Sequence, residues 1–377
     1  MFWAIIFKTN TEERMIKEIH EIGPSKVIQL FFPVSNFHAI VVVDNVALGP
    51  SIGGVRVSPD VTLEEVKRLA RTMTMKNSIA GLPHGGGKAG MIVDPRDPKK
   101  EHYFRIFAQA IKNLHEYIPG PDMGSNEECM AWIYDEIGRA TALPEEIGGL
   151  PLDKLGATGF GLAECAEIAC PYANIELKGA KVAIQGFGSV GKAAAKFLSE
   201  KGAVIVAVSD TKGSVCSPEG IDVKELLNVK ENTGSVTNYK KGSGKICSEL
   251  FLAQCDILIP AATPDVINKD NVEAVKAKMI LQGANIPATK EAEEILHKKG
   301  ILSIPDFIAN AGGVIMAAME YEGKSEREAF TAISERVKKN TKSILEKSSG
   351  EKILPRQAAE AIAKKRVLRA MQYKRIL

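Results

Sequence analysis

Apolar and polar positions change their spacing along the 377-residue chain. The stretch KVAIQGFG (181–188) is apolar on both faces, and SVGKAAAKFLSEKG (189–202) then repeats at helical spacing. A second run that is apolar on both faces, AVIVAVSD (203–210), follows directly. Strands buried on both faces are typical of parallel sheets, so this order predicts a strand–helix–strand unit.

Further strands are predicted downstream and extend the same sheet. They are CDILIPAA (255–262), KMILQGAN (278–285) and GILSIPDFIANAGG (300–313). After Glu320 the pattern is helical and charged to the end of the chain. Strands that alternate with helices indicate a doubly wound α/β domain, which we place at residues 166–340.

The earlier part of the chain mixes β-rich runs with helical patterns. AIVVVDNVAL (39–48) predicts a strand, and TLEEVKRLARTMTMKNSIA (62–80) predicts a helix. Thr62 precedes Glu65 by three residues, the spacing of a capping box. We expect a first domain at residues 1–165, to which the helices of 341–377 return.

The charge and hydropathy favour neither a nucleic-acid nor a membrane partner. The 49 basic and 46 acidic residues leave a net charge of +3, and no basic run is interleaved with aromatic residues. No apolar stretch approaches the roughly 18 residues that cross a bilayer. The apolar start MFWAIIF (1–7) lacks a basic region before it and a small-residue cleavage site after it, so it predicts a strand or helix turn rather than a targeting signal.

Cysteine and histidine spacing gives no sign of a metal centre. The six cysteines include no CxxC pair, and their scatter predicts reduced thiols in a cytoplasmic chain. The six histidines show no HExxH or HxH spacing, so we expect no metal site. The chemistry is therefore expected to depend on an organic cofactor or on acid–base groups.

Gly186, Gly188 and Gly191 form a GxGxxG motif between a predicted strand and a predicted helix. The three glycines permit a tight turn, the approach of a pyrophosphate and close helix–strand packing, and the helix N-terminus attracts phosphate. Asp210 ends the next predicted strand, where a carboxylate accepts hydrogen bonds from both ribose hydroxyls. This context predicts a dinucleotide site. The alternative is a glycine-rich turn that binds no nucleotide.

The acid at Asp210 also bears on the choice of cofactor. Its negative charge repels a 2′-phosphate, which favours NAD over NADP. Lys212 offers a cation for that phosphate and weakens the preference. We expect NAD and keep NADP as the alternative.

The stretch GLPHGGGKAG (81–90) places three glycines in front of Lys88. It is not a phosphate-binding loop, because Leu82 stands where the first glycine is required and Ala89 where Ser or Thr is required. The lysine therefore needs another explanation.

Lys76 lies upstream of Lys88, and Asp122 lies downstream. Two neighbouring lysines depress each other's pKa, and a lysine whose pKa is lowered acts as a general base. A solvated surface charge is the alternative for each of them. Glycines in an ordered segment cost entropy, however, so those before Lys88 indicate that something approaches it closely.

From about Pro24 to the C-terminus, the chain resembles the Glu/Leu/Phe/Val amino-acid dehydrogenases in the order and spacing of its motifs. The matching stretches are LGPSIGGVR (48–56), MTMKNSIAGLPHGGGKAGMIVDP (73–95), PGPDMGSNEECMAWIYDE (119–136), GATGFG (156–161), IQGFGSVG (184–191), CDILIPAA (255–262), GAN (283–285) and PDFIANAGGV (305–314).

This resemblance implies a fold and a reaction. The fold is α/β, with a mixed-sheet substrate-binding, catalytic and oligomerisation domain, a Rossmann-type dinucleotide-binding domain, and a cleft between them. The reaction is the reversible oxidative deamination of an L-amino acid to a 2-oxo acid and ammonium, with hydride transfer to NAD(P). The resemblance also implies a homo-oligomer, namely a hexamer.

The resemblance implies roles for individual residues as well. Lys88 is the base that handles water or ammonia at the substrate α-carbon, Asp122 transfers protons, and Lys76 binds the α-carboxylate. The other residues expected at the substrate are Ile52, Gly53, Asn310, Val314 and Ala317. The residues expected at the cofactor are Thr158, Gly186, Phe187, Gly188, Ser189, Val190, Gly191, Asp210, Ala261, Ala262, Asn285 and Asn310.

Two positions depart from the glutamate-type members of that family. Those members carry a lysine at the place of Ile52 and a serine at the place of Ala317, and the two groups hold the side-chain carboxylate. Both residues are apolar here. We therefore expect an apolar substrate of the leucine, valine or phenylalanine type, with glutamate as the alternative.

Two hypotheses from other classes remain open. The first is a catalytically dead protein that binds NAD and acts as a sensor or assembly partner; the presence of Lys88, Asp122 and Lys76 favours an enzyme instead. The second is another two-domain NAD enzyme, such as a hydroxy-acid dehydrogenase. Such enzymes depend on a histidine with a carboxylate partner, and no histidine here stands in a suggestive context.

Overall fold

The computed structural model describes residues 21–240, 250 and 253–374. The predicted element at MFWAIIF (1–7) lies outside these residues. The chain divides into two compact units. This division does not test the predicted domain boundaries, which stay predictions. Unit 1 comprises the described parts of Met1–Thr74, Pro83–Ala140 and Arg366–Leu377, and unit 2 those of Met75–Leu82 and Thr141–Lys365.

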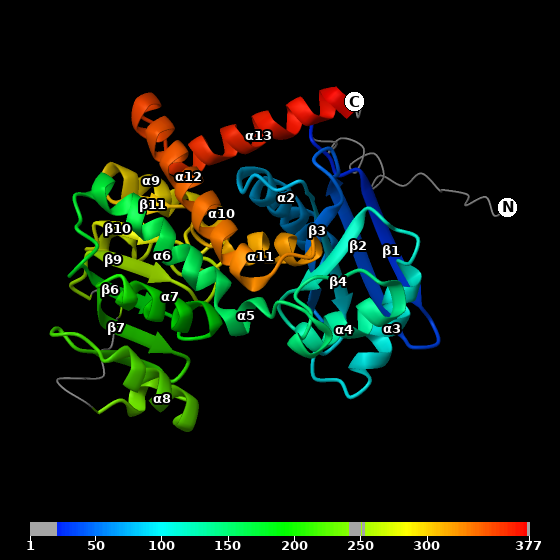
Figure 1. Ribbon diagram of the computed structural model, residues 1–377, viewed down its shortest axis with the longest axis horizontal. Coiled ribbons are helices and arrows are strands. Elements are labelled where there is room, and N and C mark those ends of the chain that lie inside the picture. The colour runs from blue at the N-terminus through cyan, green and yellow to red at the C-terminus, as the bar shows by residue number, and fades with distance from the viewer. Residues whose placement is uncertain (1–20, 241–249, 251–252, 375–377) are drawn as a thin grey trace. The chain divides into compact units, whose positions relative to one another are not determined.

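Unit 1 contains a five-stranded sheet in the order β1-β2-β4-β3-β5 (Figure 1). β2 is antiparallel to β1 and β4, whereas β3 is parallel to β4 and β5. The sheet is thus mixed, as predicted. The helices α3 and α4 lie side by side next to it in Figure 1. The bounds are β1 Lys26–Phe32, β2 Phe37–Asn45, β3 Ser51–Val57, β4 Gly85–Ile92, β5 Tyr117–Pro121, α3 Lys100–Ala110 and α4 Glu127–Ile137.

The predicted helix at 62–80 forms α2, Leu63–Ile79. The hydroxyl of Thr62 accepts a hydrogen bond from the Glu65 amide at 3.2 Å, so the predicted capping residue begins the helix. α2 contributes residues to both units, because the division falls between Thr74 and Met75.

Unit 2 contains a six-stranded sheet in the order β11-β10-β9-β6-β7-β8. All its neighbouring strands are parallel except β7 and β8. Each strand predicted from Lys181 onward is present, which confirms the Rossmann-type architecture. The strands are β6 Lys181–Gln185, β7 Val204–Asp210, β8 Gly213–Cys216, β9 Ile257–Pro260, β10 Met279–Leu281 and β11 Leu302–Ile304.

The helices of unit 2 follow the predicted alternation, and the charged C-terminal part is helical as expected. The α-helices are α5 Leu152–Leu155, α6 Ala157–Ala169, α7 Ser189–Glu200, α8 Val223–Thr233, α9 Lys290–Lys298, α10 Asp306–Ala309, α11 Gly312–Tyr321, α12 Glu326–Glu351 and α13 Pro355–Lys374, of which α13 ends in unit 1. The 3₁₀ turns are η1 Glu145–Ile147, η2 Cys170–Ala173, η3 Val236–Asn238 and η5 Val272–Ala274.

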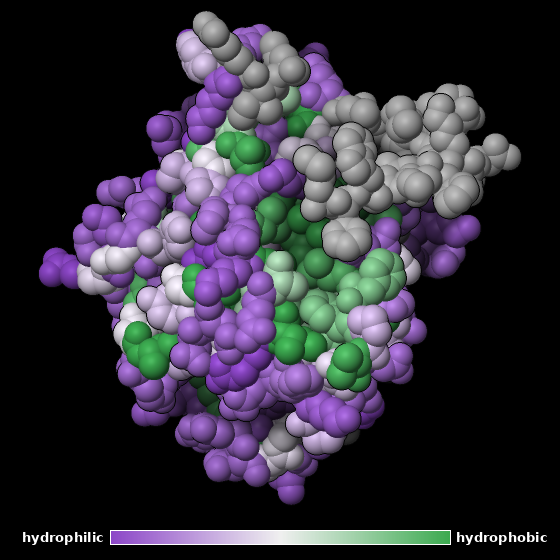
Figure 2. All heavy atoms as spheres, turned by 90° about the vertical axis from the view of Figure 1, so that its right-hand side faces the viewer, coloured by the Kyte–Doolittle hydropathy of each residue, from purple (hydrophilic) through white to green (hydrophobic). Residues whose placement is uncertain are grey.

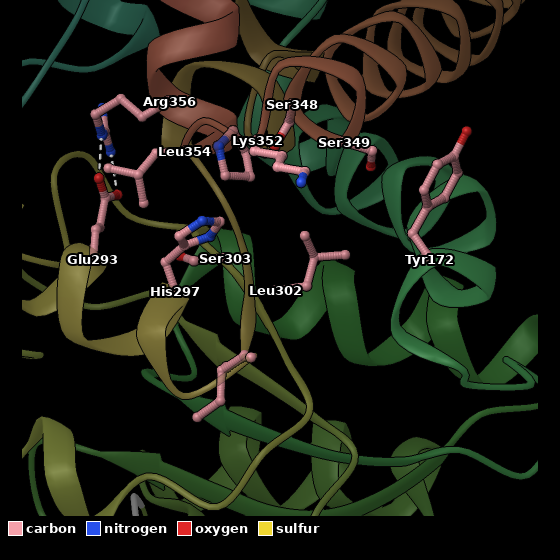
Figure 3. Close-up of a pocket in the computed structure, with 13 residues that line it drawn as sticks. Tyr172, Glu293, His297, Leu302, Ser303, Ser348, Ser349, Lys352, Leu354 and Arg356 are labelled. Atoms are coloured by element: carbon pink, nitrogen blue, oxygen red, sulfur yellow. Dashed lines mark hydrogen bonds and ion pairs between the residues drawn. The ribbon is translucent and has the colours of Figure 1, made fainter.

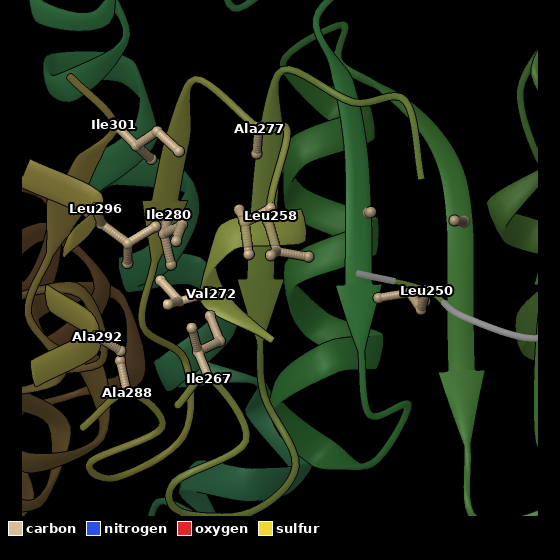
Figure 4. Packing of buried hydrophobic residues seen from close by; sticks show 13 residues of the cluster. Leu250, Leu258, Ile267, Val272, Ala277, Ile280, Ala288, Ala292, Leu296 and Ile301 are labelled. Carbon is tan, nitrogen blue, oxygen red and sulfur yellow. The ribbon is translucent and has the colours of Figure 1, made fainter. Parts of the chain in front are cut away.

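A buried apolar cluster covers one face of the unit 2 sheet (Figure 4). Leu258 of β9 and Ile280 of β10 belong to this cluster together with Leu296 of α9. On β6, Ala183 belongs to this cluster, whereas the next residue, Ile184, contacts Gly191 of α7. Because successive residues of a strand face opposite sides, the sheet is covered on both faces.

The cysteine prediction needs one correction. Cys129, Cys165, Cys170 and Cys255 are free thiols, but Cys216 at the end of β8 is disulfide-bonded. Sequence spacing missed this bond because a disulfide depends on Cα proximity in the fold rather than on a CxxC pattern. In the described ranges, no helix is both long and apolar enough to span a membrane.

Candidate active site

Lys88 and Asp122 form a buried ion pair in unit 1. Lys88 lies on β4 and Asp122 directly follows β5. Lys88 Nζ lies 2.9 Å from Asp122 Oδ2, and the two side chains are only 7% and 13% exposed. The structure thus brings together the two residues predicted to be catalytic.

Arg56 of β3 is a third member of this group, and sequence reasoning missed it. Its Nε donates to Asp122 Oδ2 at 2.9 Å, and its Nη1 donates to Glu65 Oε1 at 2.5 Å. The signal was present in the sequence, because Arg56 is the one charged residue of the strand SIGGVRV. A buried charge of that kind needs a partner.

The two cations keep Asp122 ionised. Burial alone would raise the pKa of this carboxyl, but the charges of Lys88 and Arg56 outweigh burial and lower it below its ordinary value. Tyr117 is fully buried nearby, and its hydroxyl donates to the Gly53 carbonyl at 2.8 Å. Burial and the charge of Asp122 raise the pKa of Tyr117 well above its ordinary value, so the phenol stays neutral.

The space beside the glycines before Lys88, where side chains would lie, is filled by the protein's own atoms. A Cβ at Gly86 would lie 2.0 Å from the Thr74 amide nitrogen of α2, and one at Gly87 would lie 2.8 Å from Ser51 Oγ. These glycines therefore let β4 pack closely against its neighbours. Since Gly86, Lys88 and Gly90 are two residues apart, Lys88 leaves the strand on the face that α2 covers.

The residues predicted to contact the substrate are divided between the two units. Ile52 and Gly53 lie on β3 in unit 1, and Ile52 is buried. The others lie in unit 2; Lys76 is buried on α2, and Asn310 stands between α10 and α11. On α11, Ala317 is buried and Val314 is half-buried.

The GxGxxG turn of unit 2 has the geometry that a dinucleotide requires. Gly186 has a φ of +94°, and a Cβ at Gly191 would lie 1.9 Å from the Gly186 carbonyl oxygen. Apart from Gly188 and its two chain neighbours, no atom of the described residues lies within 4 Å of a Cβ at Gly188, so this glycine borders open space. Phe187 is buried, and Ser189 and Val190 begin α7. The turn therefore fits a pyrophosphate at the N-terminus of α7.

Two residues predicted for the nicotinamide side contact each other. Asn310 Nδ2 donates to Asn285 Oδ1 at 3.3 Å and to the Gly283 carbonyl at 3.2 Å. Asn310 Oδ1 is buried and has no hydrogen-bond partner in the described residues, which leaves an acceptor for a bound group. Thr158, at the start of α6, lies beside Gly313, whose Cβ would be 2.9 Å from Thr158 Oγ1.

The loop after β9 packs onto the same turn. A Cβ at Gly186 would lie 2.8 Å from the Ala262 side chain and 3.0 Å from the Ala261 carbonyl carbon. The predicted cofactor residues Ala261 and Ala262 are thus in contact with the first glycine of the motif.

Arg356, the second residue of α13, anchors the loop that carries Asn285 through hydrogen bonds. Its Nη2 donates to Asp306 Oδ1 at 3.1 Å and to Gln282 Oε1 at 3.0 Å. Its Nε donates to Glu293 Oε2 at 2.7 Å. Asp306 Oδ2 in turn accepts from the Ile286 amide at 3.0 Å. Sequence reasoning did not predict this contact, which joins residues 50 and more positions apart.

Arg356 also lines a pocket of about 340 Å³ (Figure 3). The pocket lies where α9, β11, the end of α12 and the start of α13 meet, and Figure 3 shows Glu293 paired with Arg356 at one side of it. His297 and Lys352 line it as well. It is separate from the residues predicted for substrate and cofactor.

Asp210 ends β7, and its carboxylate is occupied by other groups of unit 2. Oδ1 accepts from the Lys212 amide at 2.8 Å and from Ser235 Oγ at 3.4 Å. Oδ2 accepts from Lys230 Nζ at 2.7 Å and from the Val236 amide at 2.8 Å. Burial alone would raise the pKa of Asp210, but these donors outweigh it and lower the pKa.

Two family models match almost the whole chain. Residues 24–139 match the model described as Glu/Leu/Phe/Val dehydrogenase, dimerisation domain. Residues 148–375 match the model described as Glutamate/Leucine/Phenylalanine/Valine dehydrogenase. The chain belongs to the Glu/Leu/Phe/Val dehydrogenase family. It is therefore an amino-acid dehydrogenase that uses NAD or NADP as acceptor, as predicted.

Individual relatives of this dehydrogenase support the same assignment. It is 43% identical over 314 residues to the NADP-specific glutamate dehydrogenase of Saccharolobus shibatae, covering 78% of this chain and 74% of the relative. It is 36% identical over 347 residues to the NAD-specific glutamate dehydrogenase of Staphylococcus aureus, covering 83% of each. The solved hetero-hexameric glutamate dehydrogenase of Thermus thermophilus, in a Leu-bound form, superposes with a TM-score of 0.84 at 29% identity and covers 96% of this chain and 94% of that one.

Proposed function

We propose that this dehydrogenase converts L-glutamate reversibly to its 2-oxo acid and ammonium. The observation that carries the chemistry is the buried pair of Lys88 and Asp122. The curated relatives described above are glutamate dehydrogenases, which supports glutamate over the apolar substrate expected from Ile52 and Ala317.

The residues around Lys88 suit proton transfer at the substrate α-carbon. We assign Lys88 the role of base toward the attacking water or ammonia. Asp122 lies within hydrogen-bond distance of Lys88 Nζ and exchanges protons with the reacting nitrogen. Arg56 keeps Asp122 ionised and oriented. A bound nicotinamide would supply the acceptor for the hydride of the α-carbon.

The remaining predicted residues receive roles in the same proposal. Lys76 binds the α-carboxylate, and Gly53, Val314 and Ala317 line the side chain of the substrate. Thr158, Asn285 and Asn310 bind the nicotinamide end of the cofactor. Gly186 to Gly191 with Ala261 and Ala262 border its pyrophosphate.

A second candidate, an apolar amino acid as substrate, is favoured by Ile52. This side chain is 3% exposed, and a glutamate carboxylate placed against it would lose hydration without gaining a partner. Burying an unpaired charge costs at least several kcal/mol, whereas each buried CH₂ of an aliphatic substrate gains about 0.8 kcal/mol.

A panel of amino acids assayed with NAD and with NADP separates these candidates. The proposal expects glutamate to exceed leucine, valine and phenylalanine in kcat/KM by at least about tenfold, the ratio for 1.4 kcal/mol. Preference for an apolar amino acid would establish the second candidate. The double variant Ile52→Lys/Ala317→Ser should then raise glutamate activity. No turnover with any amino acid would instead support a sensor or assembly protein.

We infer that the protein assembles with further copies of itself, as a hexamer. The Thermus relative is hetero-hexameric, which supports the number of six subunits, and unit 1 matches a dimerisation domain, which supports contact between like copies. On β1, Val27 and Phe31 are 40% and 61% exposed, and Figure 2 shows apolar side chains gathered on this face. Light scattering of the eluting protein measures the mass; Phe31→Glu should shift it toward smaller species, and a monomeric parent would refute the assembly.

We also propose a cytoplasmic location. Four of the five cysteines among the described residues are free thiols, and this majority fits a reducing compartment. Fractionation of expressing cells tests this, because recovery in the membrane or secreted fraction would contradict it.

A further inference from the structure

The acidic residue at the end of β7 accepts hydrogen bonds from one lysine, one hydroxyl and two main-chain amides, and these contacts bear on the choice of cofactor. We define the β7 tip as Asp210, Lys212, Lys230 and Ser235. It adjoins the GxGxxG turn, because Ser209, the residue before Asp210, accepts a hydrogen bond from the Gly186 amide at 3.0 Å. In a dinucleotide-binding fold this position faces the ribose of the adenosine.

Asp210 has little capacity left for ribose hydroxyls. A carboxylate offers about four acceptor positions. Here four donors of the chain use them, namely the Lys212 amide, the Val236 amide, Lys230 Nζ and the Ser235 hydroxyl. The Asp210 side chain is only 4% exposed. NAD would therefore have to displace one of these donors to bind Asp210 through its ribose.

The same contacts leave donors available for an anion. Lys230 Nζ uses two of its three N–H groups, toward Asp210 Oδ2 at 2.7 Å and the Gly234 carbonyl at 3.1 Å, and its side chain is 21% exposed. Lys212 is exposed, and its Nζ lies 3.7 Å from the position of a Cβ at Gly234. Both ammonium groups thus flank the same short segment.

The charges at the tip add up in favour of an anion. One carboxylate and two ammonium groups leave a net charge of +1 on Asp210, Lys212 and Lys230. The carboxylate holds Lys230 in place through the contact at 2.7 Å. Its charge is neutralised by that contact, so a phosphate meets Lys212 and the remaining N–H of Lys230 rather than an unpaired acid.

We propose that the β7 tip binds the 2′-phosphate of NADP(H), with Lys230 as the residue that determines cofactor specificity and Asp210 as the residue that positions it. Lys212 completes the phosphate site. This inference rests on the proposed function in one respect, namely that the GxGxxG turn binds a dinucleotide.

Direct binding tests the proposal without turnover. The fluorescence of NADH and of NADPH is titrated with the full-length protein. NADPH should bind at least about tenfold more tightly than NADH, since a hydrogen bond between charged groups is worth that factor or more. Equal affinities, or tighter NADH, would overturn the inference while leaving the dinucleotide site intact. Failure of both to bind would overturn the dinucleotide site itself.

A substitution locates the effect at Lys230. Lys230→Met should weaken NADPH by about 10- to 100-fold and NADH by less than about threefold. Lys224→Met is the matched control, because it removes the same charge from an exposed position of the same helix and should leave both affinities unchanged. An equal loss for NADH and NADPH in Lys230→Met would assign the residue a structural role only.

A competition measurement on the parent protein keeps the test independent of how any variant folds. Adenosine 2′,5′-bisphosphate and adenosine 5′-monophosphate share the base, the ribose and the 5′-phosphate, but only the first has a 2′-phosphate. The first should displace NADPH at a concentration about tenfold lower, again the factor of one charged hydrogen bond. Equal displacement would place the phosphate contacts elsewhere.

Discussion

Each unit of the molecule contains a buried aspartate paired with a lysine, and the two pairs differ in what else holds the acid. In unit 1, Lys88 Nζ lies 2.9 Å from Asp122, and the second cation on Asp122 is the side chain of Arg56. In unit 2, Lys230 Nζ lies 2.7 Å from Asp210, which also accepts from main-chain amides. Side chains can follow a proton as it moves, whereas amides of a turn are fixed donors. Asp122 is thus suited to proton transfer, and Asp210 to holding a cation in place.

The largest effect is expected at Lys88. Lys88→Met removes the base but none of the residues of unit 2, so kcat should fall by at least about 10³-fold, general-base and positioning losses combined. The fluorescence titration with NADPH should be unchanged. Activity within about tenfold of the parent would remove Lys88 from the catalytic role. It would also remove the contrast between the two lysine–aspartate pairs.

Two glycines test whether the surroundings of the two pairs differ as described. A methyl group at Gly86 would meet the Thr74 backbone at 2.0 Å, so Gly86→Ala should lower the free energy of unfolding by about 3 kcal/mol or more, an overpacking effect.

Gly188→Ala is its counterpart in unit 2. Gly188 has a φ of −86° and borders open space, so alanine should change the free energy of unfolding by less than about 0.5 kcal/mol. It should weaken NADH and NADPH by similar factors, because the pyrophosphate is common to both. Denaturant unfolding and the binding titration measure these outcomes; equal stability losses at the two glycines would contradict the comparison.

Arg56 offers a smaller and pH-dependent effect. Arg56→Met should lower kcat by about 10- to 100-fold, the equivalent of one charged hydrogen bond. In the parent, the pKa of Asp122 is lowered below its ordinary 3.8, so its contribution to stability is present above that value and is lost as pH falls through the lowered pKa. Without Arg56 the pKa rises, so acid unfolding should begin at a higher pH. An unshifted acid transition would show that Lys88 alone sets the pKa.

The smallest effect is expected at Lys212. Its ammonium is exposed and therefore screened by salt, so Lys212→Met should weaken NADPH only about two- to fivefold, with the loss shrinking as ionic strength rises. A loss as large as that of Lys230→Met would reverse the assignment of the two lysines.

The Rossmann-type sheet could be predicted from sequence because its signals are local. Three contiguous segments form the strand–helix–strand unit, namely KVAIQGFG, the helix after it and AVIVAVSD. Each shows a hydrophobic pattern typical of its own type of element. The pairing of Lys88 with Asp122 rested instead on the resemblance to the family. No period in the sequence shows that β4 and β5 are both neighbours of β3.

The missed residues are those whose partners are far away in sequence. Arg56 is 66 positions from Asp122, and Lys230 is 20 positions from Asp210. A lysine on a helix such as α8 looks like any solvated charge until β7 is placed beside it. The predicted preference for an apolar substrate rested on two residues. The similarity to glutamate dehydrogenases extends over many positions along the chain and outweighs that prediction.

Neither unit is a contiguous piece of the chain. Unit 1 includes Met371, whose sulfur accepts from Asn45 Nδ2 at 3.5 Å across 326 positions. Unit 2 includes Gly81, whose carbonyl accepts from Arg336 Nη1 at 2.7 Å. During synthesis, therefore, the five strands of unit 1 are made before the part of α13 that belongs to the same unit. A fragment that stops before Arg356 would leave the carboxylates of Glu293 and Asp306 buried without their cation, so the dinucleotide-binding half cannot be separated by trimming the C-terminus.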